Sequence, residues 1–142
     1  TVREEYLERL KKAGVNWLAL GIESGNRKIR VDSVKGKFRE VDVKDIVDKI
    51  ESFDIEIISN YMFGMSGDTH ETMQQTLDLA TELNTSSANF NPTMIFPGSP
   101  LFTEAYNKGI ELPPTYSGYS YYSKDSFPNP TETLSREEIL KL

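Results

Sequence analysis

The sequence of 142 residues contains no cysteine and a single histidine, His70. Without cysteine the chain cannot form a disulfide, supply thiolate ligands to zinc or to an iron–sulfur cluster, or use thiol catalysis. One histidine also argues against a self-contained metal centre, because structural and catalytic zinc sites combine several such ligands. Any metal chemistry therefore depends on groups outside these residues.

Long apolar runs and an excess of positive charge are missing as well. No stretch of 18 consecutive apolar residues occurs and no signal peptide opens the chain, so we expect a cytoplasmic protein without a membrane segment. The 16 Lys and Arg residues are outnumbered by 22 Asp and Glu, which gives a net charge of -6. Since phosphate backbones are bound by clustered cations, nucleic acid is not an expected partner.

Apolar residues fall at helical spacing in three segments of the chain. Between these segments lie apolar or alternating runs that are typical of strands. Asp42 is expected to cap the second helix and Asp68 or Thr69 the third, while a capping box of Thr1 and Glu4 begins the first. Pro92 cannot donate to a ladder, so the third strand is an edge, is bulged, or ends near it. The predicted helices are 1–13 (stripe Val2, Tyr6, Leu10, Ala13), 43–53 (Val43, Ile46, Val47, Ile50, Phe53) and 69–83 (Met73, Leu77, Ala80, Leu83), and the predicted strands are 17–22, 55–63 and 88–96.

This alternation with short connections predicts right-handed βαβ units and a parallel sheet. Three strands occupy residues 17–96, a spacing typical of a (β/α) barrel, whereas a complete eight-stranded barrel needs about 250 residues. We therefore predict an α/β fold: a partial, TIM-like (β/α) barrel of about three parallel βα units at 1–109. An irregular arm and the start of a truncated helix follow at 110–142.

The arm holds four tyrosines, and it ends in a second capping box, formed by Ser135 and Glu138. Aromatic side chains in such an arm either cover a core or stack on a ligand. Because the helix after Ser135 has barely begun where the sequence stops, we expect an excised fragment of a longer protein. The tyrosines are Tyr116, Tyr119, Tyr121 and Tyr122.

Three loops follow the predicted strands, at residues 23–26, 64–69 and 97–100. Active sites of parallel α/β proteins gather at these strand ends, although each loop is also explained as a simple turn. Glu23 directly follows a buried strand, where its carboxylate could accept from ribose hydroxyls or an ammonium group. It is also explained as a solvated residue or as the ion-pair partner of Arg27 or Lys28.

Other polar residues have two explanations each. Asn60, Asn89 and Asn91 lie within predicted strands and face either solvent or a polar lumen. For His70, in the first turn of a helix, a surface position is the simpler interpretation. The basic segment Lys35-Gly36-Lys37 is explained more simply as a solvated face than as a phosphate site.

Four stretches at these loops resemble the radical S-adenosylmethionine (SAM) superfamily. The similarity covers about residues 1–110, and the tail 127–142 also resembles the segment after that family's barrel. It is strongest to a branch of iron–sulfur oxidoreductases that often carry a cobalamin-binding domain. Ser66 stands where Pro is usual and Asp68 where Glu is usual. The stretches are Gly21-Ile22-Glu23-Ser24-Gly25, Lys35-Gly36, Phe63-Gly64-Met65-Ser66-Gly67-Asp68-Thr69 and Phe96-Pro97-Gly98-Ser99-Pro100.

The resemblance implies strands four to six of a six-stranded (β/α) barrel, with SAM lying across the strand ends. It implies that Glu23, with Ser24 and Gly25 beside it, contacts the ribose or the amino-acid part of SAM. At the next strand end, Phe63 and Gly64 would border the adenine, also largely by backbone and apolar contacts. Residues 91–96 and Pro97 would border it from the third strand, through Asn91 and Phe96, largely by backbone and apolar contacts.

The family's Cys-x-x-x-Cys-x-x-Cys loop, whose thiolates hold a [4Fe–4S] cluster, is absent from this chain. The resemblance therefore implies a parent protein that reductively cleaves SAM to a 5′-deoxyadenosyl radical. This chain would supply part of the SAM-binding surface and be inactive alone. The small-molecule substrate is not identified by the sequence, and cobalamin is a further cofactor that the parent could use.

Two alternatives stay open. The chain could be a cluster-free (β/α) binding or regulatory module, or an unrelated (β/α) enzyme fragment that binds phosphate at the Gly25 or Gly67 loop. Under the fragment hypothesis its partner is the rest of the parent chain. Because half a barrel leaves two sheet edges uncovered, we also expect the fragment to self-associate.

Overall fold

The computed structural model describes residues 2–33 and 42–141, so the predicted Thr1 cap and the Lys35-Gly36-Lys37 segment lie outside the described residues. Helices and strands alternate through the first two thirds of the chain, as the sequence predicts. The strands are β1 (Trp17–Glu23), β2 (Glu56–Phe63) and β3 (Ser87–Pro92). The helices are α1 (Glu4–Lys12), α2 (Arg27–Ser33), α3 (Val43–Glu51), α4 (His70–Leu83), α5 (Pro100–Asn107) and α6 (Arg136–Ile139), with a 3-10 helix, η1, at Tyr116–Tyr119.

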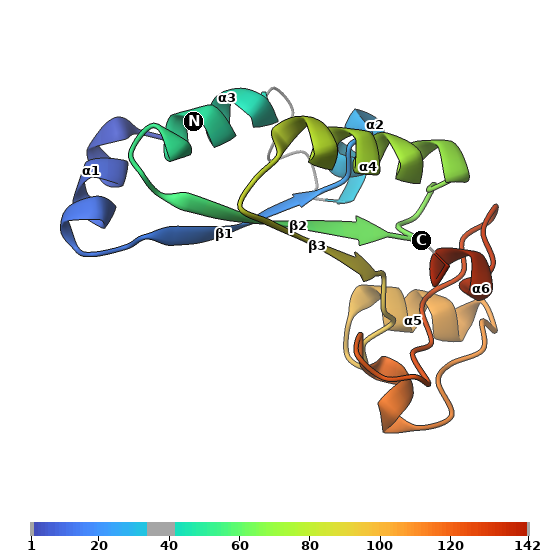
Figure 1. Cartoon of the computed structure of the whole chain (residues 1–142). Helices are drawn as coiled ribbons and strands as arrows, with labels where there is room; N and C mark the ends of the chain where they lie inside the picture. The colour runs from blue at the N-terminus through green and yellow to red at the C-terminus, as the bar shows by residue number, and fades with distance from the viewer. Residues whose placement is uncertain (1, 34–41, 142) are drawn as a thin grey trace.

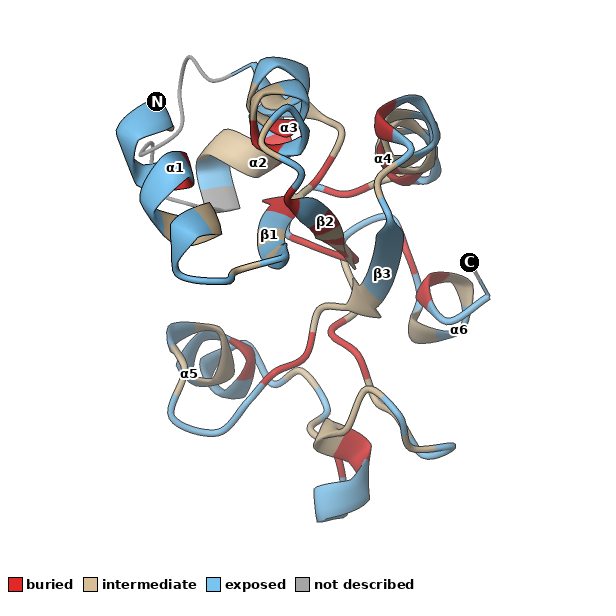
Figure 2. Cartoon of the chain, turned by 60° about the vertical axis from the view of Figure 1, so that its left-hand side comes forward, coloured by how far each residue is buried: buried red, intermediate tan, exposed pale blue. Residues whose placement is uncertain are grey.

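The three strands form a parallel sheet in the order β1-β2-β3, with helical connections between neighbours. Helices α1 to α4 lie on one face of this sheet, while α5 and η1 lie on the other side (Figures 1 and 2). The prediction of an α/β fold with parallel βα units is therefore confirmed. The three-stranded sheet is consistent with part of a (β/α) barrel.

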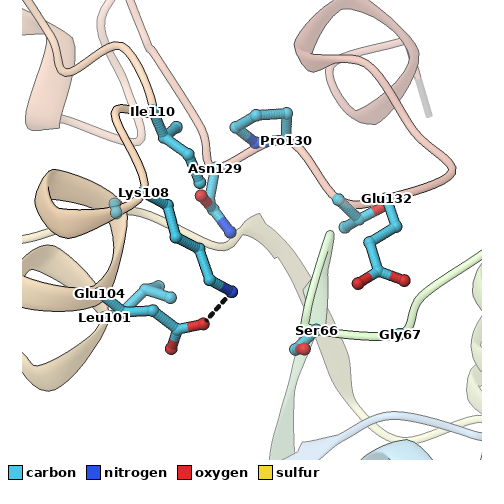
Figure 3. A pocket seen from close by; sticks show the side chains of 11 residues that line it. Ser66, Gly67, Leu101, Glu104, Lys108, Ile110, Asn129, Pro130 and Glu132 are labelled. Atoms are coloured by element: carbon cyan, nitrogen blue, oxygen red, sulfur yellow. Dashed lines mark hydrogen bonds and ion pairs between the residues drawn. The ribbon is translucent and has the colours of Figure 1, made fainter.

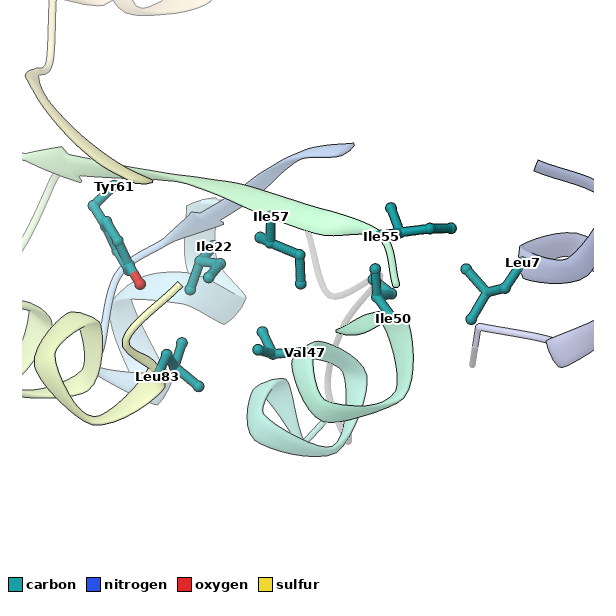
Figure 4. Packing of buried hydrophobic residues seen from close by; sticks show 8 residues of the cluster. All are labelled: Leu7, Ile22, Val47, Ile50, Ile55, Ile57, Tyr61 and Leu83. Atoms are coloured by element: carbon teal, nitrogen blue, oxygen red, sulfur yellow. The ribbon is translucent and has the colours of Figure 1, made fainter. Parts of the chain in front are cut away.

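The main core lies between the sheet and its helices. Along β2 the residues alternate between buried and partly exposed, and the buried set faces the helices because side chains of a strand alternate between its two faces. Figure 4 shows Ile57 and Tyr61 of β2 pointing toward Val47 of α3 and Leu83 of α4. The buried members of this cluster are Leu7, Ile22, Val47, Ile50, Ile55, Ile57, Tyr61 and Leu83.

Most predicted helix caps are confirmed. The Asp42 carboxylate accepts from the amides of Lys44 and Asp45, and the Thr69 hydroxyl accepts from the amide of Thr72. Ser135 and Glu138 form the predicted capping box of α6.

The apolar stripe predicted for the first helix is partly wrong. Leu7, which the prediction omits, is buried, whereas Tyr6 and Ala13 are exposed. Leu7 and Leu10 are about one helical turn apart, so they lie on the same face of α1, and that face packs on the core. Tyr6 lies on another face and points away from the sheet. The Arg3 guanidinium lies over the Tyr6 ring instead, 5.5 Å from its centroid.

The third strand is shorter than the predicted 88–96, because β3 ends at Pro92. Proline has no amide hydrogen to donate, and the next residue, Thr93, still bonds back to the Phe63 carbonyl over 2.7 Å. Phe96 and Pro97 therefore lie beyond the strand, in the connection to α5. Two helices, α2 and α5, add to the predicted elements.

Residues 110–141 return toward the end of β2. The hydroxyl of Thr133 donates to the Asp68 carbonyl at 2.7 Å, and Leu134 and Ile139 share a small core with Phe63 and Met73. The arm includes η1 and α6 between irregular stretches. Its boundary at residue 109 stays a prediction.

The face of the sheet opposite α1 to α4 is largely open in the part of the chain that the structure describes. Trp17 is 58% exposed, and Ala19 and Gly21 of β1 are also exposed, whereas the alternate residues of β1 pack on the core. Within the described residues, β1 and β3 also end the sheet without a further strand. Unpaired strand edges and uncovered apolar surface favour association with another chain.

We accordingly predict that the isolated chain forms dimers or larger species, as measured by light scattering across a range of concentrations. Ala19→Lys places a charge on the open face of β1 and should shift the population toward monomer. The matched control is Ala13→Lys, at an exposed position at the end of α1, which should leave the association unchanged. A monomeric wild-type chain at every concentration would contradict the prediction.

Candidate functional site

The candidate site is the open face of the sheet near the carboxyl ends of its strands. Glu23 is the last residue of β1 and adopts a left-handed conformation, with φ of 69°, at a shift in the pairing between β1 and β2. Its side chain folds back over Gly21: a Cβ built on Gly21 would lie 2.5 Å from Glu23 Oε1. Because Gly21 has no side chain, the Glu23 carboxylate can occupy this space.

The environment of Glu23 favours a proton on its carboxylate more than water does. Burial raises the pKa of Glu23 above its ordinary value, because a half-buried carboxylate loses part of its hydration. The sequence also allowed Glu23 to be a solvated loop residue, and its partial burial argues against that explanation. A half-buried acceptor at a strand end is suited to hydrogen bonds from a ligand's hydroxyl or ammonium groups.

Amide side chains continue across the same face. In the register of the sheet Gly21 lies opposite Asn60, and Asn60 opposite Asn89. Asn60 Nδ2 donates to the Leu20 carbonyl at 3.3 Å, and Asn89 Nδ2 donates to Asn60 Oδ1 at 3.1 Å. Asn91, two residues further along β3, is half-buried. The three side chains thus share the open face, and the choice between solvent and a polar lumen stays a prediction.

Ser24 and Gly25 point away from this face, toward α4. The fully buried Ser24 hydroxyl lies 3.3 Å from Thr76 Oγ1 and accepts from the amide of Asn26 at 3.1 Å. The amide of Gly25 donates to Thr76 Oγ1 at 2.9 Å. Through these hydrogen bonds Ser24 and Gly25 fix the loop that carries Glu23. Their role in the described structure is therefore structural.

Phe63 and Gly64 are also engaged in packing. The Phe63 ring stacks on Phe90 with centroids 5.4 Å apart, on the face covered by the helices. Gly64 has φ of 73°, and a Cβ there would lie 2.7 Å from Ile139 Cδ1 of α6. A contribution of these two residues to a ligand site would therefore come from their backbone.

The arm brings an additional residue to the site. Phe96, 40% exposed, meets the ring of Tyr121 edge-on with centroids 5.8 Å apart. Burial raises the pKa of Tyr121, and the negative charge of Glu23 raises it further. The sequence places Tyr121 among four arm tyrosines with no signal that separates it from the others. Pro97, the remaining predicted site residue, is exposed beside Phe96.

His70 has the surface position that the sequence interpretation favours. Its Nε2 atom lies 3.1 Å from Glu138 Oε1, so it links the start of α4 to α6. Hydrogen bonds from the Ser135 amide and hydroxyl, and then from His70, lower the pKa of Glu138 to about 2. This exposed pair joins α4 to α6, whose Ile139 packs in the small core with Phe63 and Met73.

A cavity of about 380 Å³ lies between the Ser66-Gly67 turn, α5 and the arm (Figure 3). Lys108 Nζ is paired with Glu104 Oε1 at 2.6 Å, and Glu132 lines the other side. Two carboxylates against one ammonium group make this turn a poor place for phosphate. The Gly25 amide is likewise already bonded to Thr76. Both observations disfavour the phosphate-binding alternative.

Metal and membrane features are also absent from the described residues. No group of three or more His, Asp or Glu side chains there could hold a metal ion. In the same residues, every helix is too short or too polar to cross a membrane.

Comparisons with known proteins agree with the resemblance in the sequence. The family model of the radical SAM superfamily matches residues 1–80. The chain is 25% identical over 137 residues to the anaerobic magnesium-protoporphyrin IX monomethyl ester cyclase of Cereibacter sphaeroides, covering 96% of this chain and 21% of that protein. It is 26% identical over 145 residues to the cytidylyl-2-hydroxyethylphosphonate methyltransferase of Streptomyces wedmorensis, covering 98% of this chain and 27% of that protein. The chain therefore spans about a quarter or less of the length of these curated relatives.

Proposed function

Since the chain belongs to the radical SAM superfamily, we propose that it forms part of a longer iron–sulfur oxidoreductase that cleaves SAM reductively, and that its open face binds SAM. The observation that carries this proposal is the half-buried Glu23 carboxylate, folded over Gly21 at the end of β1. In this family a [4Fe–4S] cluster supplies the electron that cleaves SAM to methionine and a 5′-deoxyadenosyl radical.

The residues of this chain fit SAM and do not fit the cluster. The sequence has no cysteine, so thiolate ligands for [4Fe–4S] must come from elsewhere in the longer protein. SAM carries ribose hydroxyls, an ammonium group and an adenine, and the open face offers a carboxylate acceptor and several amides. Cobalamin as a second cofactor rests on the resemblance of the sequence alone.

Each residue then has a definite task. Glu23 accepts hydrogen bonds from the ribose or the ammonium group, and these charge-assisted bonds are stronger than neutral ones. Asn60 is held in place by the Leu20 carbonyl and by Asn89 Nδ2. The amide of Asn91 and the remaining donor and acceptor of Asn89 then meet the heterocycle. The bonds of Ser24 and Gly25 to Thr76 keep the Glu23 loop in position before the ligand arrives.

We predict that Glu23→Gln in the full-length protein weakens SAM binding about tenfold. A neutral amide preserves the shape of the side chain and removes a charged acceptor, whose hydrogen bonds are worth about 1.5–3 kcal/mol. Equilibrium dialysis with SAM measures the affinity. The control is Glu56→Gln, at the opposite, amino-terminal end of β2, where the exposed side chain is far along the strand from Glu23.

An unchanged affinity of the Glu23 variant would contradict the proposed site. A wild-type protein that fails to bind SAM, although the fold is intact by circular dichroism, would favour the cluster-free binding or regulatory module instead. That outcome would keep the (β/α) scaffold and remove the SAM chemistry.

A further inference from the structure

The arm that follows the partial barrel returns to the candidate site through one side chain. Tyr121 lies 25 residues after Phe96 in the sequence, yet their rings meet edge-on at 5.8 Å with an interplanar angle of 83°. Edge-to-face contact is a favoured geometry for aromatic pairs and fixes the direction of the Tyr121 ring. The contact therefore brings the arm to the end of the connection that leaves β3.

The same tyrosine also lies near the end of β1. The charge of Glu23 acts on the Tyr121 phenol, which places the two groups within electrostatic reach of one another. Tyr121 thus contacts the segment after β3 through Phe96 and lies within electrostatic range of Glu23 at the end of β1. Its neighbour Tyr122 is 93% exposed and lacks this position, although its ring also meets that of Tyr121 edge-on at 6.5 Å.

We propose that Tyr121 is a further binding residue of the SAM site, and that its phenol hydroxyl bonds to the same nucleoside that Glu23 holds. This inference rests on the proposed function. A phenol provides one donor and two acceptor positions at the end of a rigid ring, so it can meet ribose hydroxyls or a ring nitrogen of the adenine. Because Phe96 already orients that ring, little side-chain entropy is lost when the ligand binds.

The arm then acts as a wall of the site. Two hydrogen bonds outside the proposed site stabilise its return path. The Thr133 hydroxyl donates to the Asp68 carbonyl, and the backbone N–H of Asn129 donates to the Thr93 carbonyl at 2.8 Å. Both contacts are made within the chain and need no ligand. Tyr121 is therefore expected to be in place in the free protein.

The test compares Tyr121→Phe with Tyr122→Phe in the full-length protein. Phenylalanine keeps the ring contact with Phe96 and removes only the hydroxyl, so the fold should be retained. We expect Tyr121→Phe to weaken the binding of SAM, and of S-adenosylhomocysteine as an unreactive probe, about fivefold by equilibrium dialysis. Tyr122→Phe should leave both affinities unchanged.

A second measurement uses the wild-type protein and no variant. S-adenosylhomocysteine should protect Tyr121 from nitration by tetranitromethane, as read by mass spectrometry of the peptides, while Tyr122 stays reactive. Equal affinities for the two tyrosine variants, or equal nitration of Tyr121 with and without the probe, would overturn the inference. If Glu23→Gln weakens binding in the same assays, the proposed function survives that failure. If Glu23→Gln has no effect either, both fall.

Discussion

Replacing Gly25 with alanine should lower the free energy of unfolding by about 3 kcal/mol. The loop that carries Gly25 lies directly against α4, and a Cβ at this position would overlap the Gln75 carbonyl oxygen and lie 2.7 Å from Thr76 Cα. Both groups are helix backbone, so the overlap cannot be relieved by rotating a side chain. The loop or the helix must move, and the bond from the Gly25 amide to Thr76 Oγ1 is then strained or lost.

Urea unfolding followed by circular dichroism measures this loss of stability. Gly109→Ala is the matched control, because its φ is 67° and nothing lies within 4 Å of the added Cβ. That variant has only the penalty of a left-handed alanine, about 1 kcal/mol. If the two variants lose equal stability, close packing against α4 is not the reason for glycine at position 25.

Replacing Thr76 with valine should destabilise the chain by about 2–3 kcal/mol. Thr76 is fully buried, and its hydroxyl accepts from the Gly25 amide, lies 3.3 Å from Ser24 Oγ and donates to the Thr72 carbonyl at 3.1 Å. Valine has nearly the same shape, so the change removes hydrogen bonds and leaves packing almost intact. The Gly25 amide and the Ser24 hydroxyl then lose a partner in a site that water does not reach.

Thr76→Ser separates the hydroxyl from the methyl group in the same unfolding assay. Serine keeps the oxygen and loses one methyl group, so the expected loss is about 1 kcal/mol. A serine variant as unstable as the valine variant would show that the methyl group, and not the hydrogen bonds, holds the loop. Because this loop carries Glu23, we also expect SAM to bind more weakly to the valine variant than to the serine variant.

The sequence by itself determined the three strands, the helices before and between them, and the edge at which a site could form, but not helices α2 and α5. Helix caps such as Asp42 and Thr69 were predictable because the bonding partners lie within three residues along the chain. Strand and helix periods were predictable for the same reason, and together they imply parallel βα units. The absence of cysteine excluded cluster ligands without any structure.

Only the tertiary structure decided which side of each strand end lies on the open face of the sheet. Ser24 and Thr76 are 52 positions apart, and no local pattern shows that a buried hydroxyl pair fixes the Glu23 loop. The stacking of Phe63 on Phe90, which turns its ring toward the helices, likewise joins two strands and has no local signal in the sequence. The sequence does not distinguish Tyr121 from the other three arm tyrosines, and only its contact with Phe96 in the folded arm does so. Such contacts depend on packing between distant segments, whereas periodicity and capping depend on neighbours along the chain.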